Sequence, residues 1–150
     1  QGHTVKMVYG TNSTTDVRSY QATAVTTTGL EHQCTLALSG TGYYLPATLY
    51  LTISKDENWV SADLKAGTTE EFKDKDGRMV LKRIFTLTET LSTYYVYDNL
   101  GNLNFVLPPG ADPDAGIPSQ AVLDNFCYQY RLFPNSEYSC KYSKRNNPYT

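Results

Sequence analysis

Two stretches decide the fold: Phe72-Lys73-Asp74-Lys75-Asp76-Gly77-Arg78-Met79-Val80-Leu81 and Tyr95-Val96-Tyr97-Asp98-Asn99-Leu100-Gly101-Asn102-Leu103-Asn104-Phe105. Each runs from aromatic or apolar residues to an Asp, then to a Gly three positions later, and on into an alternating apolar run. Asp at the first position of a type I turn accepts hydrogen bonds from nearby backbone N–H groups, and Gly adopts the positive φ that completes a three-residue hairpin loop. The sequence therefore predicts two antiparallel hairpins, with turn residues Asp74 and Gly77 in the first and Asp98 and Gly101 in the second.

The composition favours one β-rich domain. The chain has 150 residues, about the length of a single domain, and it contains 13 tyrosines together with many threonines, which suit half-buried strands. The formal net charge is −2, which gives no electrostatic basis for binding nucleic acid or an anionic membrane. No apolar run reaches the roughly 20 residues that span a bilayer, so membrane insertion is not expected.

The fold expected from these patterns is mainly β. Antiparallel hairpins should form a twisted sheet or sandwich, with one short helix near residues 118–126 that begins at Pro118. The proline-rich residues 108–116 should end the sheet. Expected strands are 48–53, 70–73, 79–85, 93–97, 103–107 and 127–131.

The chain divides by character into three regions. Residues 1–66 form an expected N-terminal β region, with a candidate seam at residues 66–68. Residues 67–131 hold the two hairpins, the proline loop and the helix, and residues 132–150 form a polar, basic tail. A single compact domain is the alternative to this division.

Motifs for catalysis or metal binding are lacking. Cys34, Cys127 and Cys140 lie far apart, so zinc ligation is not expected, and His3 and His32 belong to no recognisable triad or metal motif. A carboxylate pair needs only two acids at the right separation, and any β protein offers such a set; the candidates here are Glu70, Glu71, Asp74 and Asp98. The sequence therefore predicts a protein without catalytic residues, cofactor or metal.

The tyrosines permit two interpretations. An exposed group of rings could contact a glycan, and the candidates are Tyr43, Tyr44, Tyr95 and Tyr97. The other interpretation is cross-strand packing within a sheet. Alternation places Tyr95 and Tyr97 on one face of their strand and Tyr94 with Val96 on the other, so about half of the rings should pack in the core. Asn12-Ser13-Thr14 is also a formal glycosylation sequon.

An ordered set of segments resembles the Rhs or YD-repeat proteins of bacteria, in the part that contains a domain of unknown function before the repeats. The segments are Gly2-His3-Thr4-Val5-Lys6, Tyr9-Gly10-Thr11-Asn12, Gly42-Tyr43-Tyr44, Thr48-Leu49-Tyr50, Glu71-Phe72-Lys73-Asp74-Lys75-Asp76-Gly77-Arg78, Thr93-Tyr94-Tyr95-Val96-Tyr97-Asp98, Phe105-Val106-Leu107-Pro108-Pro109 and residues 123–131. Tyr97 and Asp98 match the Tyr-Asp pair that names the family. The second copy departs from the usual Gly-Arg, because Asn102 follows its glycine.

The resemblance implies a structural module of a large cell-surface or secreted protein. In that family the repeats form long sheets that coil into a shell or serve adhesion, and no catalytic residue belongs to this region. The expected partners are further repeats of the same polypeptide or a neighbouring chain, and exposed sheet edges favour a homodimer. The alternative function is carbohydrate binding through exposed tyrosines.

Overall fold

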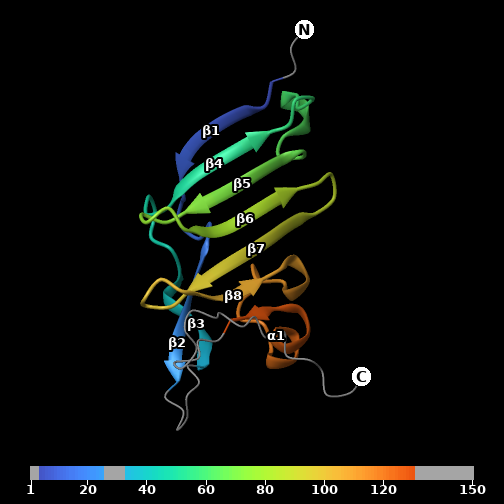
Figure 1. Ribbon diagram of the computed structural model, residues 1–150. Helices are drawn as coiled ribbons and strands as arrows, with labels where there is room; N and C mark the ends of the chain where they lie inside the picture. Colours follow the sequence, from blue (N-terminus) through green and yellow to red (C-terminus); the bar gives the residue numbers. More distant parts are fainter. Residues whose placement is uncertain (1–3, 26–32, 131–150) are drawn as a thin grey trace, which may run out of the picture.

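The computed structural model describes residues 4–25 and 33–130, and the chain within these limits forms two antiparallel sheets (Figure 1). The expected tail at 132–150, Cys140, His3 and His32 lie outside the described residues. The elements are β1 (Lys6–Thr11), β2 (Arg18–Val25), β3 (Gln33–Tyr43), β4 (Tyr50–Lys55), a 3-10 turn (Ser61–Asp63), β5 (Thr68–Lys73), β6 (Met79–Phe85), β7 (Thr90–Tyr97), β8 (Leu103–Leu107), a second 3-10 turn (Pro109–Ala111), α1 (Gln120–Phe126) and β9 (Tyr128–Gln129).

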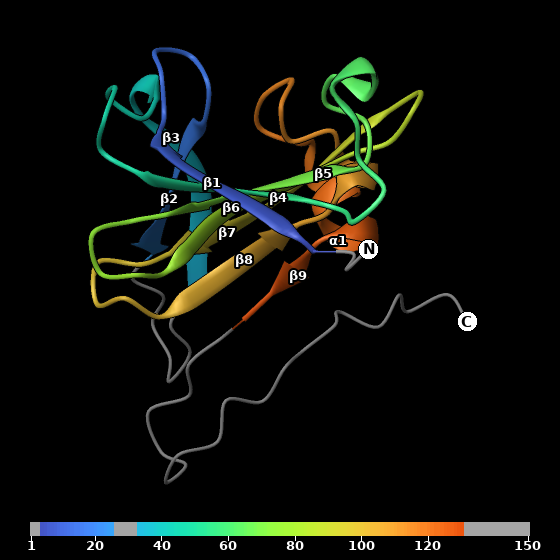
Figure 2. The same ribbon diagram turned by 90° about the horizontal axis from the view of Figure 1, so that it is seen from above.

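The larger sheet has seven strands in the order β1-β4-β5-β6-β7-β8-β9, and β2 and β3 pair separately. Figure 2 shows the twist of the large sheet, in which β1 and β8 cross at a wide angle, with the β2–β3 pair against one part of it. This arrangement confirms the expected mainly β fold with antiparallel hairpins and one short helix. The sheet is continuous across residues 66–68, because β4 and β5 pair along their full lengths.

A row of apolar side chains crosses the large sheet. The registers place Leu51, Phe72, Leu81, Tyr94 and Leu107 opposite one another on strands β4 to β8. All of them except the partly buried Leu51 are almost completely buried. Since successive side chains on a strand point to opposite faces, this row defines the inner face of the sheet.

The β2–β3 pair covers this row and closes the core. Tyr20 of β2 meets Tyr94 of β7 edge to face, with ring centroids 5.3 Å apart. Such aromatic pairs contribute about 0.5–1.5 kcal/mol beyond the area that they bury. Ala22 and Cys34 are buried beside them, and Leu123 of α1 packs against the same cluster.

Asn12 ties together the two connections that pass between the sheets. Its side chain is 2% exposed, and its Oδ1 accepts hydrogen bonds from the backbone N–H groups of Thr48 at 3.0 Å and Leu49 at 2.8 Å. Its Nδ2 donates to the carbonyl oxygen of Leu45 at 2.8 Å. Both ends of the amide are therefore engaged, and the first residue of the formal sequon is inaccessible to a glycan.

A charged row lies two residues further along the inner face. The registers place Glu70 opposite Arg83, and Arg83 opposite Ser92. Arg83 Nη1 lies 3.4 Å from Glu70 Oε2, and Arg83 Nε donates to Ser92 Oγ at 3.3 Å. Lys65, from the β4–β5 connection, lies 2.9 Å from the other carboxylate oxygen of Glu70. Both members of the central pair are buried, Glu70 at 4% and Arg83 at 9% exposure.

Arg83 also holds two loops on the sheet. Its guanidinium lies 3.3 Å from the carboxylate of Asp16 and donates to the carbonyl oxygen of the same residue at 3.1 Å. It also lies 3.5 Å from Asp114 Oδ1, to which the Tyr94 hydroxyl donates at 2.7 Å. Burial alone would lower the pKa of Arg83, but the neighbouring Asp114, Tyr94, Glu70 and Asp16 raise it. The β1–β2 connection and the proline-rich loop therefore share one cation.

The proline-rich loop is fastened from the smaller sheet as well. Arg18 Nε donates to the carbonyl oxygen of Asp114 at 3.0 Å, and its Nη2 donates to the next carbonyl oxygen at 3.1 Å. The Tyr20 hydroxyl lies 2.6 Å from the carbonyl oxygens of Pro113 and Gly116. Burial raises the pKa of Tyr20 to about 12, so this hydroxyl keeps its donor proton at neutral pH.

Two elements near the C-terminal end differ from the expectation in extent. The helix begins at Gln120 because Ser119 is its N-cap, with Oγ accepting from the backbone N–H of Val122 at 3.4 Å. The expected apolar stripe is only partly used, since Phe126 is 56% exposed. Of the expected strand 127–131, the described residues include the two-residue β9, and Arg131 lies outside them.

Replacing Arg83 with Met should lower the free energy of unfolding by about 3 kcal/mol, because it leaves Glu70 and Asp16 without their shared cation in a buried site. The matched control is Lys82→Met, which removes a half-exposed cation 3.8 Å from Glu71 on the other face and should cost less than about 1 kcal/mol. Urea unfolding measures both. Equal costs for the two variants would contradict the role given to Arg83.

Candidate functional site

The first hairpin turn joins β5 to β6. The backbone N–H of Gly77 donates to the carbonyl oxygen of Asp74 at 2.9 Å, and the N–H of Asp74 donates to the carbonyl oxygen of Arg78 at 3.0 Å. Asp74 Oδ1 accepts from the backbone N–H groups of Asp76 and Arg78, both at 2.9 Å. Gly77 has a φ of 78°, the left-handed value that favours glycine.

The second turn, between β7 and β8, repeats each of these contacts 24 residues later, from Asp74 to Asp98. The N–H of Gly101 donates to the carbonyl oxygen of Asp98 at 3.0 Å, and Gly101 has a φ of 84°. Asp98 Oδ1 accepts from the N–H groups of Leu100 at 2.9 Å and Asn102 at 2.8 Å. A register shift precedes both turns at the equivalent position. The two hairpins are therefore copies of one local structure, side by side in one sheet.

The carboxylate of the second turn is held in its charged form. Burial acts to raise the pKa of Asp98, but hydrogen bonds from the side chain and backbone of Asn102, from Asn104 and from Leu100 outweigh it. The pKa of Asp98 is therefore lowered below its ordinary value. Accepting several donors in this way stabilises the anion and makes the turn sensitive to acid.

Arg78 connects the first hairpin to the second. Its Nε donates to Asp74 Oδ2 at 2.7 Å, and its Nη2 lies 3.1 Å from Asp76 Oδ2. The same guanidinium lies over the ring of Tyr97, with Cζ 5.0 Å from the centroid. A Cβ atom added to Gly101 would lie only 2.8 Å from Arg78 Nη1. We call this contact of Arg78 with Tyr97 and Gly101 the arginine clamp.

The second hairpin keeps the contact between the residue after the glycine and the turn aspartate. Asn102 occupies the position of Arg78, and its Nδ2 donates to Asp98 Oδ2 at 3.1 Å, as Arg78 Nε does to Asp74. The shorter amide side chain supplies no guanidinium to lie over a ring of the following strand. The departure from Gly-Arg therefore leaves the second hairpin without a guanidinium equivalent to that of Arg78, while the turn itself is retained.

The four candidate glycan-contact tyrosines, Tyr43, Tyr44, Tyr95 and Tyr97, are all partly buried. Arg18 lies over the ring of Tyr43, 4.5 Å from its centroid, and Arg78 covers Tyr97. Tyr44 packs against the core, and burial raises its pKa. The Tyr97 hydroxyl donates to the carbonyl oxygen of Met79 at 2.9 Å. An arginine guanidinium therefore lies against one face of the Tyr43 ring and one face of the Tyr97 ring.

The most exposed tyrosines of the described residues lie elsewhere. Tyr9 on β1 is 74% exposed, Tyr50 on β4 is 64% exposed and Tyr128 on β9 is 52% exposed. Tyr9 and Tyr50 lie on adjacent strands, with Tyr50 opposite Thr11. Alternation along the strand predicts that Tyr9 and Thr11 share one face. It does not predict that this face is exposed.

The candidate acids are distributed among structural contacts. Glu70 is paired with Lys65 and Arg83, whereas Glu71 lies on the opposite face of β5, 3.8 Å from Lys82. Asp74 and Asp98 each accept hydrogen bonds within a turn. Within residues 4–25 and 33–130, no group of three or more His, Cys, Asp or Glu side chains could hold a metal ion.

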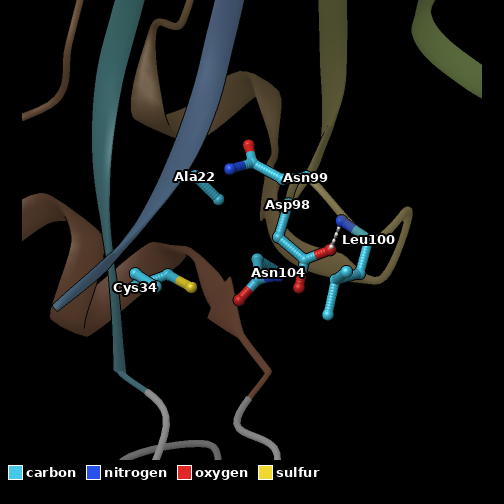
Figure 3. A pocket seen from close by; sticks show the side chains of 7 residues that line it. Ala22, Cys34, Asp98, Asn99, Leu100 and Asn104 are labelled. Carbon is cyan, nitrogen blue, oxygen red and sulfur yellow. Dashed lines mark hydrogen bonds between the residues drawn. The ribbon is translucent and has the colours of Figure 1, made fainter. Parts of the chain in front are cut away.

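A hollow of about 340 Å³ lies between the smaller sheet and the second turn. Figure 3 shows Ala22 and Cys34 on one side of it and Asp98, Asn99 and Leu100 on the other, with Asn104 between them. A second hollow of about 350 Å³ also includes Cys34 and is bordered by Phe105, Leu123 and Gln129. Burial raises the pKa of Cys34, so its sulfur is a protonated thiol and a poor nucleophile at neutral pH.

The arginine clamp predicts unequal costs for two alanine substitutions. Gly77→Ala and Gly101→Ala both force a side chain to positive φ, at roughly 1–2 kcal/mol each. No other atom lies within 4 Å of an added Cβ at Gly77, whereas Arg78 must move at Gly101. Gly101→Ala should therefore cost more by about 0.5–1 kcal/mol, measured by urea unfolding. In an Arg78→Ala background the two costs should be equal, and an excess that persists there would contradict the clamp.

The Asp98 carboxylate predicts a pH-dependent contribution to stability. Its folded-state pKa lies below the unfolded value of about 3.9. Its contribution is therefore present above the unfolded pKa and is lost as pH falls through the folded pKa. Asp98→Ala should lower the free energy of unfolding by about 1.5–3 kcal/mol at neutral pH, and the deficit should shrink below about pH 4. Urea titrations across this range, with Glu57→Ala as an exposed control, test it; a deficit independent of pH would refute the charge effect.

None of the helices in the described part of the chain is long and apolar enough to cross a membrane. Comparisons of the chain with family models, with curated proteins and with solved structures found no match.

Proposed function

We propose that this chain is a non-catalytic structural module of an Rhs/YD-repeat-like protein of the cell surface or secreted space, in which it contributes β-shell or adhesion surface. The observation that carries the proposal is the repetition of one hairpin at an interval of 24 residues, from Asp74 to Asp98. Each copy has the same turn hydrogen bonds and the same glycine conformation. Repeats of this kind add surface by stacking units.

The order of the strands supports growth by addition. From β4 onward every strand pairs with the next one in sequence, so each new hairpin extends the sheet at one edge. The arginine clamp joins one hairpin to the next through side chains that belong to the turn itself. A contact of this kind lies between neighbouring units, as the contacts of a repeat array do.

The chemistry of the acidic residues supports a non-catalytic role. Glu70 and Asp114 share the Arg83 network, and Asp74 and Asp98 hold turns together. Each of these acids is engaged in contacts that hold loops and strands in place. The glycan-binding alternative gains little, because Tyr43 and Tyr97 carry arginines on their rings.

The register at the β9 edge suggests a direct test. Gln129 lies opposite Phe105 and Tyr128 opposite Val106, so Tyr128-Gln129-Tyr130 has the same facing as Tyr95-Val96-Tyr97. A second copy of residues 98–107 inserted directly after Tyr130 should fold back as a new hairpin strand beside β9. The matched control carries Asp→Ala and Gly→Val in the inserted turn only.

Amide hydrogen exchange measures the result. The insertion should protect the added strand and the backbone of β9 from exchange, and the control insertion should not. Absence of protection in both chains would reject the hairpin as an additive unit, and with it the structural-module proposal.

A further inference from the structure

The two edges of the large sheet are unlike each other. β9 has two residues, whereas β1 has six and pairs with β4 along its whole length without a bulge. Natural edge strands avoid association by being short, by bulging, or by carrying proline or several charges. Within Lys6–Thr11 the lone charged residue is Lys6, and no proline is present.

β1 is also exposed on both faces. All six of its residues are exposed, with Met7 at 57%, Val8 at 44% and Tyr9 at 74%. Met7 and Tyr9 share one face, where the Tyr9 hydroxyl lies 3.6 Å from the sulfur of Met7. Val8 lies on the other face, opposite Ile53. Among the described residues no strand pairs with the outer side of β1.

We propose that a second copy of this chain docks on this edge, with the two β1 strands antiparallel about a twofold axis at Val8. Such an axis, perpendicular to the sheet, places Val8 opposite Val8 of the second copy. Met7 then faces Tyr9 of the second copy, and Lys6 faces Gly10. Sulfur–aromatic contacts are favourable, and no like charges oppose each other. The interface is isologous, so it closes at two copies.

Self-complementarity favours a second copy over an unrelated strand. The edge supplies apolar side chains at matching positions on each face, and its one cation meets a glycine, which leaves room for the lysine. Each copy contributes the six residues of β1 to this interface, well below the 20–30 residues per side of a standard interface. The dimer should therefore be reversible, with an affinity in the micromolar range. This inference concerns β1 and stands independently of the proposed repeat function, whose test reports on β9.

Sedimentation velocity of the full chain over a range of concentrations tests the proposal. The wild-type chain should pass from monomer to dimer as concentration rises. Val8→Lys and Val8→Glu should each remain monomeric, because like charges meet at the axis. An equimolar mixture of the two variants should dimerise again, because Lys then faces Glu. Far-ultraviolet circular dichroism verifies that each variant keeps its fold.

The control is Leu87→Lys, which adds the same charge at a residue that is 91% exposed in the β6–β7 turn. This variant should dimerise like the wild type. A wild-type chain that stays monomeric at high micromolar concentration would overturn the proposal. So would a Val8→Lys variant that still dimerises, or a folded mixture that fails to recover the dimer.

Discussion

The guanidinium of Arg83 is the centre on which the arrangement of the sheets depends. It lies buried on β6 and contacts Glu70 on β5, Ser92 on β7, Asp16 before β2 and Asp114 in the proline-rich loop. A buried cation is costly unless its partners are in place. The smaller sheet, the long loop and the central strands are therefore specified together, because each delivers one partner to the same charge.

The apolar row beside Arg83 forms the buried centre of the sheet. The ion pairs of Arg83 with Asp16 and Asp114 hold the β1–β2 connection and the proline-rich loop in place on it. Tyr94 belongs to both, since its ring packs on Tyr20 while its hydroxyl donates to Asp114. Burial and this hydrogen bond raise the pKa of Tyr94, so the hydroxyl remains a donor. Packing between sheets is largely non-directional, whereas the hydrogen bond from the Arg18 backbone N–H of β2 to the Tyr94 hydroxyl of β7, 3.3 Å long, limits how far the two strands can slide past each other.

The hairpins could be predicted from sequence because the signal is local. Asp74 and Gly77 act within a few residues of themselves, and the same holds for Asp98 and Gly101. A turn of known type fixes the register of its two strands, so the pairing of Glu70 with Arg83 could also be predicted from the sequence. The contacts of Arg83 with Asp16 and Asp114 were not, because only the path of the chain between the sheets brings these distant residues together. The exposure of Tyr9 and the position of Arg78 over the Tyr97 ring also depend on how the chain is arranged in space.

Asn102 in place of an arginine gives the pair of hairpins a direction. Arg78 reaches from the first hairpin to the ring and the glycine of the second, and the second supplies no guanidinium in return. A row built of such units would be asymmetric, because the arginine of each unit would contact the next unit and no equivalent contact would run in the opposite direction. The asparagine completes its own turn through Asp98, but it offers no guanidinium to an aromatic ring on a neighbouring strand.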